Sequence, residues 1–451
     1  MKHLYHPSAQ DPTHAPSDWW HESLGVPSTI YPALGTDIEA EVAIIGGGFT
    51  GLSAAYHLAK AHGIRAVVLE RAHPGWGASG RNAGYCCMGG SALGWQQIIE
   101  QYGLEDAHAF YRVQQDSVAL VENLLVSEGI DVDRTGRGGV GLAHRASALQ
   151  ELREDAELMA DTFGANYALL DRSDLISRGM GGPHFHGGLA EDVGFGLNPY
   201  KYVIGLAQAA AKGGTAIFSG SPVTGWQRDG RRHRLTTPKG IVHADKVLIA
   251  TNGYTPEDLH GDFGGRLLPV LSTILVTQPL TNAECAAAGW TDTTPGYDLL
   301  NLHNYFRLLP DGRFLFGGRA GNSARPSALA RQSRWIESVF RRYYPAWHDV
   351  EITHRWSGFV CLAGDRLPHI GAWDSEPGVY YALAYSGTGI ALGSWAGQAI
   401  ASLMGDDGHR NQELRPTFMR RPPPRFPLPA LRMLYQSYFY HKLAIDDLLR
   451  R

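Results

Sequence analysis

Three glycines and one acid have the spacing of a site for phosphate and ribose groups. The run GGGFTG places Gly46, Gly48 and Gly51 directly after EVAII, a β-branched stretch of strand length. The apolar spacing of LSAAYHLAKAH predicts a helix, and a second strand-like run, RAVVLE, ends at Glu70. In such a unit the first glycine permits a tight turn, the second lets the main chain approach a pyrophosphate, and the third lets helix and strand pack closely. This order predicts a dinucleotide site in which Glu70 accepts hydrogen bonds from ribose hydroxyls.

A second glycine-rich loop distinguishes between the dinucleotides. GWGASGRNAG occupies residues 75–84, where a nicotinamide-binding domain would continue into a regular helix. A loop of small residues lets the main chain lie along the longer pyrophosphate-to-ribityl part of FAD. Ser79 and Asn82 are expected to donate to phosphate or ribityl groups, and Arg81 to neutralise negative charge. The loop therefore favours FAD, and a surface loop with a solvated arginine is the alternative.

Composition and charge exclude several classes of protein. The chain has 451 residues, 44% of them hydrophobic, which is enough for two cores or one discontinuous core. A formal net charge of −4 gives no basis for a sequence-independent grip on nucleic acid. The four cysteines form no CxxC pair and no zinc spacing, so we expect no metal site and a reducing, cytoplasmic location. We expect neither a signal peptide nor a transmembrane segment, because no apolar run is long enough.

A further glycine pattern, TGRGGVG, contains Gly136, Gly138 and Gly141. The preceding EGIDVDR is too charged for a buried parallel strand, and no strand ending in an acid follows at the required distance. We therefore expect no second dinucleotide site here. Without a nicotinamide-binding domain, the simplest sequence evidence for an NADPH-dependent monooxygenase is missing.

The two N-terminal loops resemble those of the D-amino-acid oxidase superfamily of FAD-dependent amine oxidoreductases. Within it, the chain is most similar to the γ-glutamylputrescine oxidoreductase-like branch. The resemblance runs from about Trp19 to Ala401 and continues in further stretches, which are NPYKYVIGLAQAAAKGG (198–214), SPVTGW (221–226), HADKVLIATNGYT (243–255), YFRLLPDGRFLFGGR (305–319), WSGFVCLAGDRLPHIG (356–371) and AYSGTGIALG (384–393).

Together the loops and the resemblance define a predicted set of cofactor-binding residues. These are Gly46, Gly48, Phe49, Thr50, Gly51, Glu70, Arg71, Gly77, Ala78, Ser79, Arg81, Asn82, Ala83, Gly84, Val223, Thr251, Gly387, Thr388, Gly389 and Ile390.

The fold implied is α/β, with a Rossmann-like FAD-binding domain and a second, α+β substrate domain built on an antiparallel sheet. We expect the FAD-binding domain to be discontinuous, and to consist of residues 38–95, 196–256 and 350–405. The substrate domain is expected to consist of 96–195 and 257–349, with a hairpin at Asp311-Gly312. Residues 406–451 are expected to form a proline-rich linker and a C-terminal helix that packs on its own chain. Weak contact of that helix with a membrane or a partner is the alternative.

The resemblance implies oxidation of a C–N bond. An amine's α-hydride passes to flavin N5, and the resulting imine is hydrolysed by water. The amine must be neutral, so an aromatic, partly dehydrated pocket is expected to favour that form. The partners implied are a small-molecule amine and an electron acceptor, which is oxygen or another acceptor.

Three residues are candidates for the substrate side. Relatives that bind amino acids carry a carboxylate-binding arginine two residues before the aspartate-glycine turn, but that position is Leu309 here and the arginine is Arg307. The period of two along a strand keeps both on one face. Tyr305 shares this face, and Tyr85 directly follows the flavin loop. The alternatives are an arginine at the sheet surface and tyrosines packed in the core.

Several departures from the family shape these expectations. Sarcosine-oxidase-like relatives carry a lysine over the flavin that helps oxygen react, whereas RLLPVLSTILVTQ at 266–278 has none. Cys361 is displaced from the cysteine that tethers FAD in some relatives, so FAD is expected to be non-covalent. His303 and His369 are interpreted as structural. Two alternative functions stay open, namely a D-amino-acid dehydrogenase that passes electrons to a quinone or carrier, and a flavin-binding protein without turnover.

Overall fold

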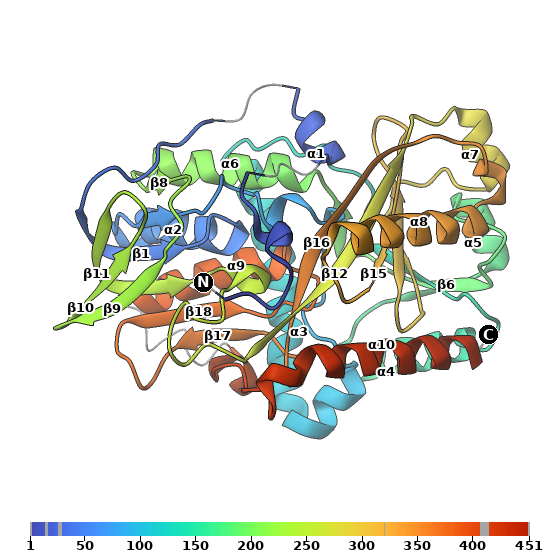
Figure 1. Cartoon of the computed structure of the whole chain (residues 1–451). Coiled ribbons are helices and arrows are strands. Elements are labelled where there is room, and N and C mark those ends of the chain that lie inside the picture. Colours follow the sequence, from blue (N-terminus) through green and yellow to red (C-terminus); the bar gives the residue numbers. More distant parts are fainter. Residues whose placement is uncertain (1, 14–16, 26–28, 320, 406–414, 450–451) are drawn as a thin grey trace.

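The β-branched run that precedes the first glycine turn forms the central strand of a mostly parallel sheet (Figure 1). In this computed structural model the described residues are 2–13, 17–25, 29–319, 321–405 and 415–449. Along the main path of the first sheet, the strands are β17 (His369–Ala372), β18 (Val379–Leu383), β11 (Ile241–Ile249), β1 (Ile38–Ile45), β2 (Val67–Leu69) and β8 (Ala216–Phe218). The hairpin β9 (Gly225–Asp229) and β10 (Arg232–Thr236) extends from β11.

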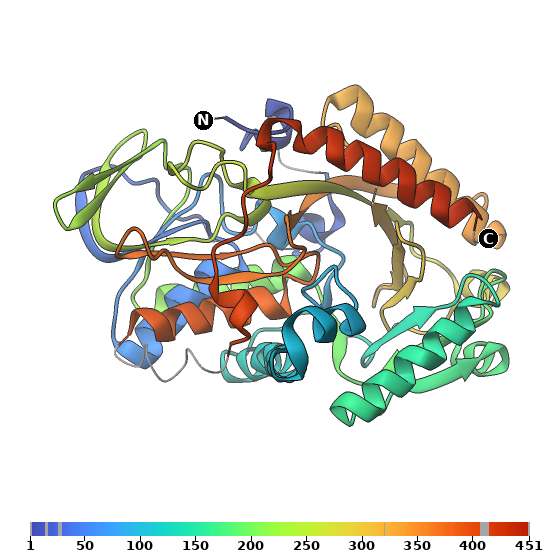
Figure 2. The same ribbon diagram turned by 90° about the horizontal axis from the view of Figure 1, so that it is seen from below.

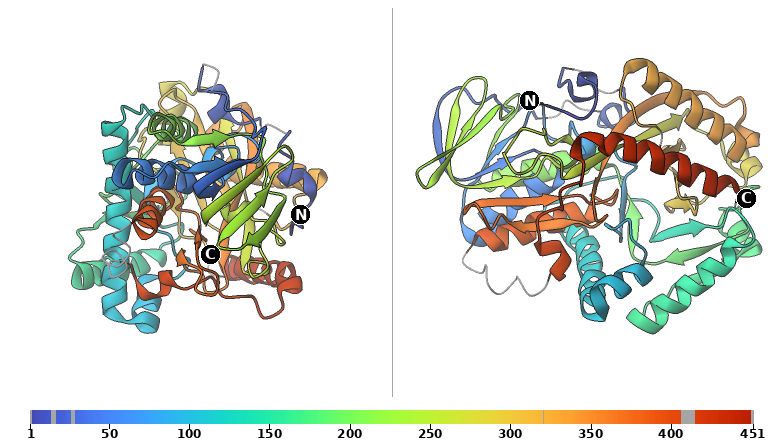
Figure 3. Two further views of the ribbon diagram at one scale, coloured as in Figure 1. Left: turned by 90° about the vertical axis from the view of Figure 1, so that its left-hand side faces the viewer. Right: turned by 60° about the horizontal axis from the view of Figure 1, so that its bottom comes forward.

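The strands of this sheet are apolar on both sides, so both of its faces must be covered. Helices cover one of them. The C-terminal half of β1 is completely or almost completely buried. Figure 3 shows helices gathered beside the sheet, and among them α2 (Phe49–His62) contacts both α6 (Pro199–Lys212) and α9 (Ala391–Met404). The long α3 (Trp95–Ser127) is packed against α9.

A second sheet lies beside the first and has eight strands. Its order is β16 (Ile352–Ala363), β12 (Leu267–Thr277), β15 (Phe314–Arg319), β14 (Asn304–Leu308), β13 (Gly296–Asp298), β4 (Gly139–Leu142), β6 (Gly187–Glu191) and β5 (Ala168–Asp171). Gly312, at φ 82°, turns the chain between β14 and β15, where the hairpin was predicted. The sheet is mixed rather than fully antiparallel, because β13 pairs with β4 in parallel.

The two faces of the second sheet have different neighbours. The outer face carries Val140, Phe306 and Phe316, which belong to a core shared with Phe340 of α8. The inner face is the opposite one and carries Ile274, which packs with residues of the first sheet's helices. Helices of the outer layer are α5 (Arg172–Arg178), α7 (Asn282–Ala288) and α8 (Pro326–Tyr343).

Two further helices flank the second sheet, which curves between them (Figure 2). They are α4 (Ala148–Phe163) and α10 (Arg432–Leu449). The carboxylate of Asp447, on α10, accepts from the main-chain N–H and side-chain amide of Asn301, at 2.9 and 2.7 Å. The terminal helix is thus tied to its own chain. Part of the predicted linker, 406–414, lies outside the described residues.

The short elements complete the chain. They are α1 (Trp19–Glu22) and a ribbon of β3 (Tyr85–Cys87) with β7 (Gly194–Gly196). Within the described residues, no helix combines the length and apolar character needed to cross a membrane.

The predicted third FAD-binding segment contains strands of both sheets. The third FAD-binding segment was expected to begin at 350, but β16 pairs along its length with β12 in the second sheet. The first sheet resumes at β17. An apolar strand pattern does not specify which sheet a strand joins, because either sheet can bury it equally well.

We expect Gly51→Ala to destabilise the protein, because a Cβ here would lie 2.0 Å from the carbonyl oxygen of Gly46 and 3.0 Å from Cγ2 of Ile44. Overpacking of this kind costs about 1–3 kcal/mol. Gly261→Ala is the matched control, since no atom lies within 4 Å of the position that its added methyl group would occupy. Thermal unfolding should show a lower midpoint for Gly51→Ala and little change for the control. Equal midpoints would contradict the close packing of α2 on β1.

Candidate active site

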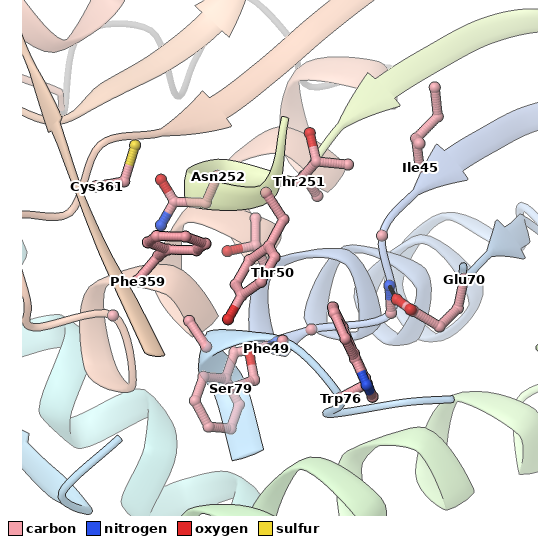
Figure 4. Close-up of a pocket in the computed structure, with 18 of the residues that line it drawn as sticks. Ile45, Phe49, Thr50, Glu70, Trp76, Ser79, Thr251, Asn252, Phe359 and Cys361 are labelled. Atoms are coloured by element: carbon pink, nitrogen blue, oxygen red, sulfur yellow. Dashed lines mark hydrogen bonds between the residues drawn. The ribbon is translucent and has the colours of Figure 1, made fainter. Parts of the chain in front are cut away.

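A pocket lies where the strands of the first sheet end (Figure 4). Ile45 and Leu69 are the last residues of β1 and β2, and Ala250 follows β11; all three line it. Ligands of open α/β sheets bind at the carboxyl ends of the strands. In Figure 4, Glu70, Ser79 and Thr251 approach this pocket from three separate segments of the chain.

Most of the predicted cofactor residues line this pocket. They are Gly46, Gly48, Phe49, Thr50, Glu70, Arg71, Gly77, Ala78, Ser79, Asn82, Val223, Thr251, Gly387, Gly389 and Ile390. Five predicted residues are not part of the lining, namely Gly51, Arg81, Ala83, Gly84 and Thr388. Gly51 instead lies beneath the turn, against the carbonyl of Gly46, which is the packing role expected for it.

The phosphate end is built from main-chain groups. Gly46 has φ 111°, which a residue with a side chain rarely adopts. Gly48 caps α2 in an extended conformation, and the N–H of Phe49 donates to Oγ of Ser79 at 3.0 Å. The N-terminus of a 14-residue helix therefore faces the pocket, with its positive dipole end available to an anion.

Glu70 lies where a ribose would be recognised. Its carboxylate accepts from the N–H of Gly47 at 2.7 Å and from that of Ala72 at 2.9 Å. Burial raises the pKa of Glu70, and these two N–H donors act in the opposite direction. Each carboxylate oxygen has a second lone pair, so the group can still accept from ribose hydroxyls.

Arg81 has one donor that the protein does not use. Its Nε donates to the carbonyl of Trp76 at 2.7 Å, and its guanidinium lies 4.5 Å from the centre of the Trp76 ring. Within the described part of the chain, its Nη2 is buried without a hydrogen-bond partner. A buried unpaired donor is costly, so this loop fits a ligand that supplies an acceptor.

The opposite end of the pocket is lined by β16 and the start of α9. Cys361 is buried there, and burial raises the pKa of its thiol well above the ordinary value. A neutral thiol is a poor nucleophile, which agrees with non-covalent FAD. The hydroxyl of Tyr385 lies 2.9 Å from Oγ1 of Thr50 and joins the two halves of the lining.

Several lining residues were not predicted from the sequence. Trp76, Tyr254 and Phe359 pack together in an aromatic cluster beside the pocket. The amide oxygen of Asn252 accepts from the N–H of Ala384 at 2.9 Å, which links two of the surrounding loops. These residues lie within stretches that carry the family resemblance, but those stretches are distant in the chain, so only the fold brings the residues together.

Arg307 does not have the role expected for it. It is 1% exposed, and it donates to the carbonyls of Ala83 at 3.0 Å and Leu197 at 2.5 Å and to Oγ1 of Thr135 at 3.3 Å. Burial lowers its pKa to about 10, so it remains charged at neutral pH. Arg307 therefore clamps the end of the flavin loop, and the protein itself engages the donors that were expected to bind a substrate carboxylate.

The two candidate tyrosines also differ from expectation. Tyr85 donates to the carbonyl of Phe306 at 2.8 Å, with the carbonyl of Gly296 at 3.0 Å, so its hydroxyl serves the second sheet rather than a substrate. Tyr305 is on the inner face, is partly exposed, and has its hydroxyl 2.7 Å from Oγ of Ser272. Both tyrosines are partly exposed, and they differ in the partners of their hydroxyl groups.

Two basic groups lie near Tyr305. Burial and the charge of Arg319 lower the pKa of His303 to about 3, and burial raises that of Tyr305 to about 12. His303 and Tyr305 are therefore uncharged at neutral pH. Arg319 ends β15 on the inner face, and no ion pair with another described residue involves it. Arg319 was not among the predicted residues, because it lies at the end of β15, away from the aspartate-glycine turn from which the substrate arginine was located.

His369 contacts Asp365 and the Arg421 carbonyl, as a structural histidine does.

Known proteins share both sequence and fold with this chain. The family profile described as DAO, FAD dependent oxidoreductase, matches residues 41–403. A probable oxidoreductase, OrdL, of Rhizobium meliloti (strain 1021) is 31% identical over 398 residues, covering 86% of this chain and 88% of that protein. Gamma-glutamylputrescine oxidoreductase of Escherichia coli (strain K12) is 29% identical, covering 84% and 87%. Glycine oxidase from Geobacillus kaustophilus has the same fold, with a TM-score of 0.68 at 20% identity over 81% of this chain and 94% of that chain.

We expect Glu70→Ala to weaken FAD binding more than it slows turnover of the loaded enzyme. A lost charge-assisted hydrogen bond costs about 1.5–3 kcal/mol, and Glu70 lies at the helix end of the pocket. Titration of the apoprotein with FAD measures the first effect, and kcat at saturating FAD the second. The control is Glu105→Ala, an exposed acid on α3. Unchanged FAD affinity would refute the assignment.

We expect Arg307→Met to lower stability and FAD retention without changing the preference between carboxylated and neutral amines. Two buried carbonyls lose their donor, at a cost of about 1–3 kcal/mol each. Thermal unfolding and the ratio of kcat/KM for an amino acid and its decarboxylated amine test this. Arg334→Met, which alters an exposed arginine of α8, is the control. A loss confined to the carboxylated substrate would restore the original assignment.

Proposed function

Because the chain belongs to the DAO family of FAD-dependent oxidoreductases, we propose that it oxidises the C–N bond of a small amine or amino acid. The pocket supports this proposal, since residues of the glycine turn, Glu70 and residues of the loop at 75–84 all line it. Bound FAD would accept a hydride from the α-carbon, so that the C–N bond becomes an imine, which water then hydrolyses.

The residues of the chain would hold the cofactor without a covalent bond. The N-terminus of α2 would face the pyrophosphate, and Glu70 would accept from the adenosine ribose. The neutral thiol of Cys361 supports a non-covalent complex.

The inner face of the second sheet would receive the substrate. An amine must reach the flavin with its nitrogen lone pair free, and desolvation favours the neutral form. His303 and Tyr305 show how strongly this region is desolvated, because burial dominates both pKa shifts. With its pKa near 3, His303 is too weak a base to deprotonate an ammonium at neutral pH. Desolvation is therefore the means by which the chain would favour the reactive form.

The electron acceptor is oxygen or a separate carrier. All residues of β12 are buried and none is a lysine, so this strand supplies no cation to assist oxygen. A D-amino-acid dehydrogenase that uses a carrier therefore remains the second candidate. The four cysteines are free, which supports a reducing, cytoplasmic compartment.

We expect the purified protein to contain one FAD that is released when the protein is denatured. A panel of amines and amino acids, added under nitrogen, should include a compound that bleaches the flavin absorbance. Air should restore the absorbance if oxygen is the acceptor, and a quinone or dye should restore it if a carrier is. Bound FMN, or FAD retained on the unfolded chain, would contradict the cofactor assignment. A flavin that no amine bleaches would support the protein without turnover.

A further inference from the structure

One carboxylate on the inner face has no cationic partner among the described residues. Glu191 ends β6, and Oε2 of its side chain accepts from the hydroxyl of Tyr167 at 3.5 Å, which is a weak hydrogen bond. Its side chain is partly exposed, and it forms no ion pair with any residue that the structure describes. Burial without a compensating charge raises the pKa of Glu191 to about 8. With this pKa the unliganded group is mainly protonated at neutral pH, and a bound cation would stabilise its ionised, carboxylate form.

Three tyrosines surround this carboxylate. Glu191 pairs with Gly139 and Tyr297 with Gly141, so the two side chains flank β4 on the same face of the sheet. Burial raises the pKa of Tyr111, Tyr167 and Tyr297, and the charge of Glu191 acts in the same direction on each. Tyr297 is 38% exposed although it comes from the middle of the sheet. Its ring therefore offers surface to a ligand. Aromatic rings around an acid attract ammonium groups through their negative faces.

Glycines on the neighbouring strand leave room for these side chains. A Cβ at Gly139 would lie 3.2 Å from Oε1 of Glu191, and one at Gly141 would lie 3.1 Å from the hydroxyl oxygen of Tyr297. Both glycines belong to the TGRGGVG pattern, whose last three residues begin β4. A second acid, Asp155 on α4, also raises the pKa of Tyr297 and adds negative potential on this side.

The carboxylate lies close to the cofactor pocket. Glu191 lies three residues before Gly194, which pairs with Cys87 in the strand that follows the flavin loop. Gly89 is two residues after Cys87, and a Cβ added there would lie 2.6 Å from Cγ2 of Thr388. The neighbours of Thr388, Gly387 and Gly389, line the pocket. Two residues span at most about 7 Å. A substrate of moderate length can therefore reach from Glu191 to the flavin end of the pocket.

We propose that Glu191, with Tyr111, Tyr167 and Tyr297, forms a subsite for a second, cationic nitrogen of the substrate. The substrate class is then a linear amine that carries an ammonium group at the end away from the reacting C–N bond. This inference rests on the proposed function, because it assigns the far end of the same substrate. Desolvation near the flavin would favour a neutral reacting nitrogen, while Glu191 would favour a charged distal one. Because the two ends of the site would favour different charge states of the two nitrogens, the substrate would bind in one direction.

The test compares binding of a diamine with that of the monoamine of equal chain length. Cadaverine and pentylamine are titrated calorimetrically, under nitrogen, into protein whose bound FAD has been reduced beforehand with dithionite, so that the flavin cannot accept a hydride. We expect cadaverine to bind the wild type about ten- to hundredfold more tightly, as a desolvated charge-assisted contact implies. Glu191→Gln keeps the shape and an acceptor for Tyr167 but removes the charge, so it should abolish the preference. Asp192→Asn removes an exposed charge at the next position and should retain it.

Equal affinities in the wild type, or a preference that survives in Glu191→Gln, would overturn the subsite. FAD content and the thermal midpoint verify that the variant is folded. If Glu191→Gln does not fold, Tyr297→Leu serves instead, and it should reduce the preference by removing a ring; an unchanged preference would refute the subsite. Binding is measured without turnover, so the result is independent of whether any amine bleaches the flavin. A flavin that no amine bleaches would reject the proposed function, while the calorimetric comparison would still decide the role of Glu191.

Discussion

A single buried guanidinium joins the parts of the chain that must meet at the flavin. Arg307 comes from the second sheet, but its hydrogen bonds end on Ala83, in the flavin loop, and on Leu197, at the entry to α6. A buried cation is costly unless its donors are satisfied, and two main-chain carbonyls at these places provide acceptors. Trp20, whose ring lies 5.5 Å from the guanidinium, donates to the carbonyl of Asn82 at 2.9 Å and adds a further link. The position of the second sheet relative to the loop therefore depends on this cluster.

Desolvation governs the chemistry available on the inner face of the second sheet. It holds His303 neutral and Tyr305 protonated, and it raises the pKa of Glu191 to about 8. Groups of this kind bind and orient a ligand but do not act as strong bases near neutral pH. The proposed oxidation agrees with this environment, because hydride transfer from a neutral amine requires exclusion of water more than it requires a general base.

Glycine has two distinct uses in this protein. In the first sheet, Gly46 and Gly51 allow a turn and a close helix crossing, and these uses follow a pattern with a fixed spacing. In the second sheet, Gly139 and Gly141 leave space in which Glu191 and Tyr297 lie. The same residue type therefore serves the cofactor in one sheet and, under our proposal, the substrate in the other.

The cofactor half of the site was predictable from the sequence because its chemistry is local. Strand, turn, helix and acid follow one another within about thirty residues, and main-chain geometry ties each glycine to its neighbour. The substrate half was not predictable, because its groups come from strands that are distant in the chain. The period of two placed Arg307 on the correct face of β14, but only the packing of that face against Ala83 and Leu197 determined that its donors are consumed. Likewise, nothing local to Glu191 reveals the tyrosines around it, because three separate elements supply them. The sequence alone therefore determined the family, the cofactor and its loops, whereas the tertiary structure decided which polar side chains remain free for a substrate, since that depends on which partners reach them in the folded chain.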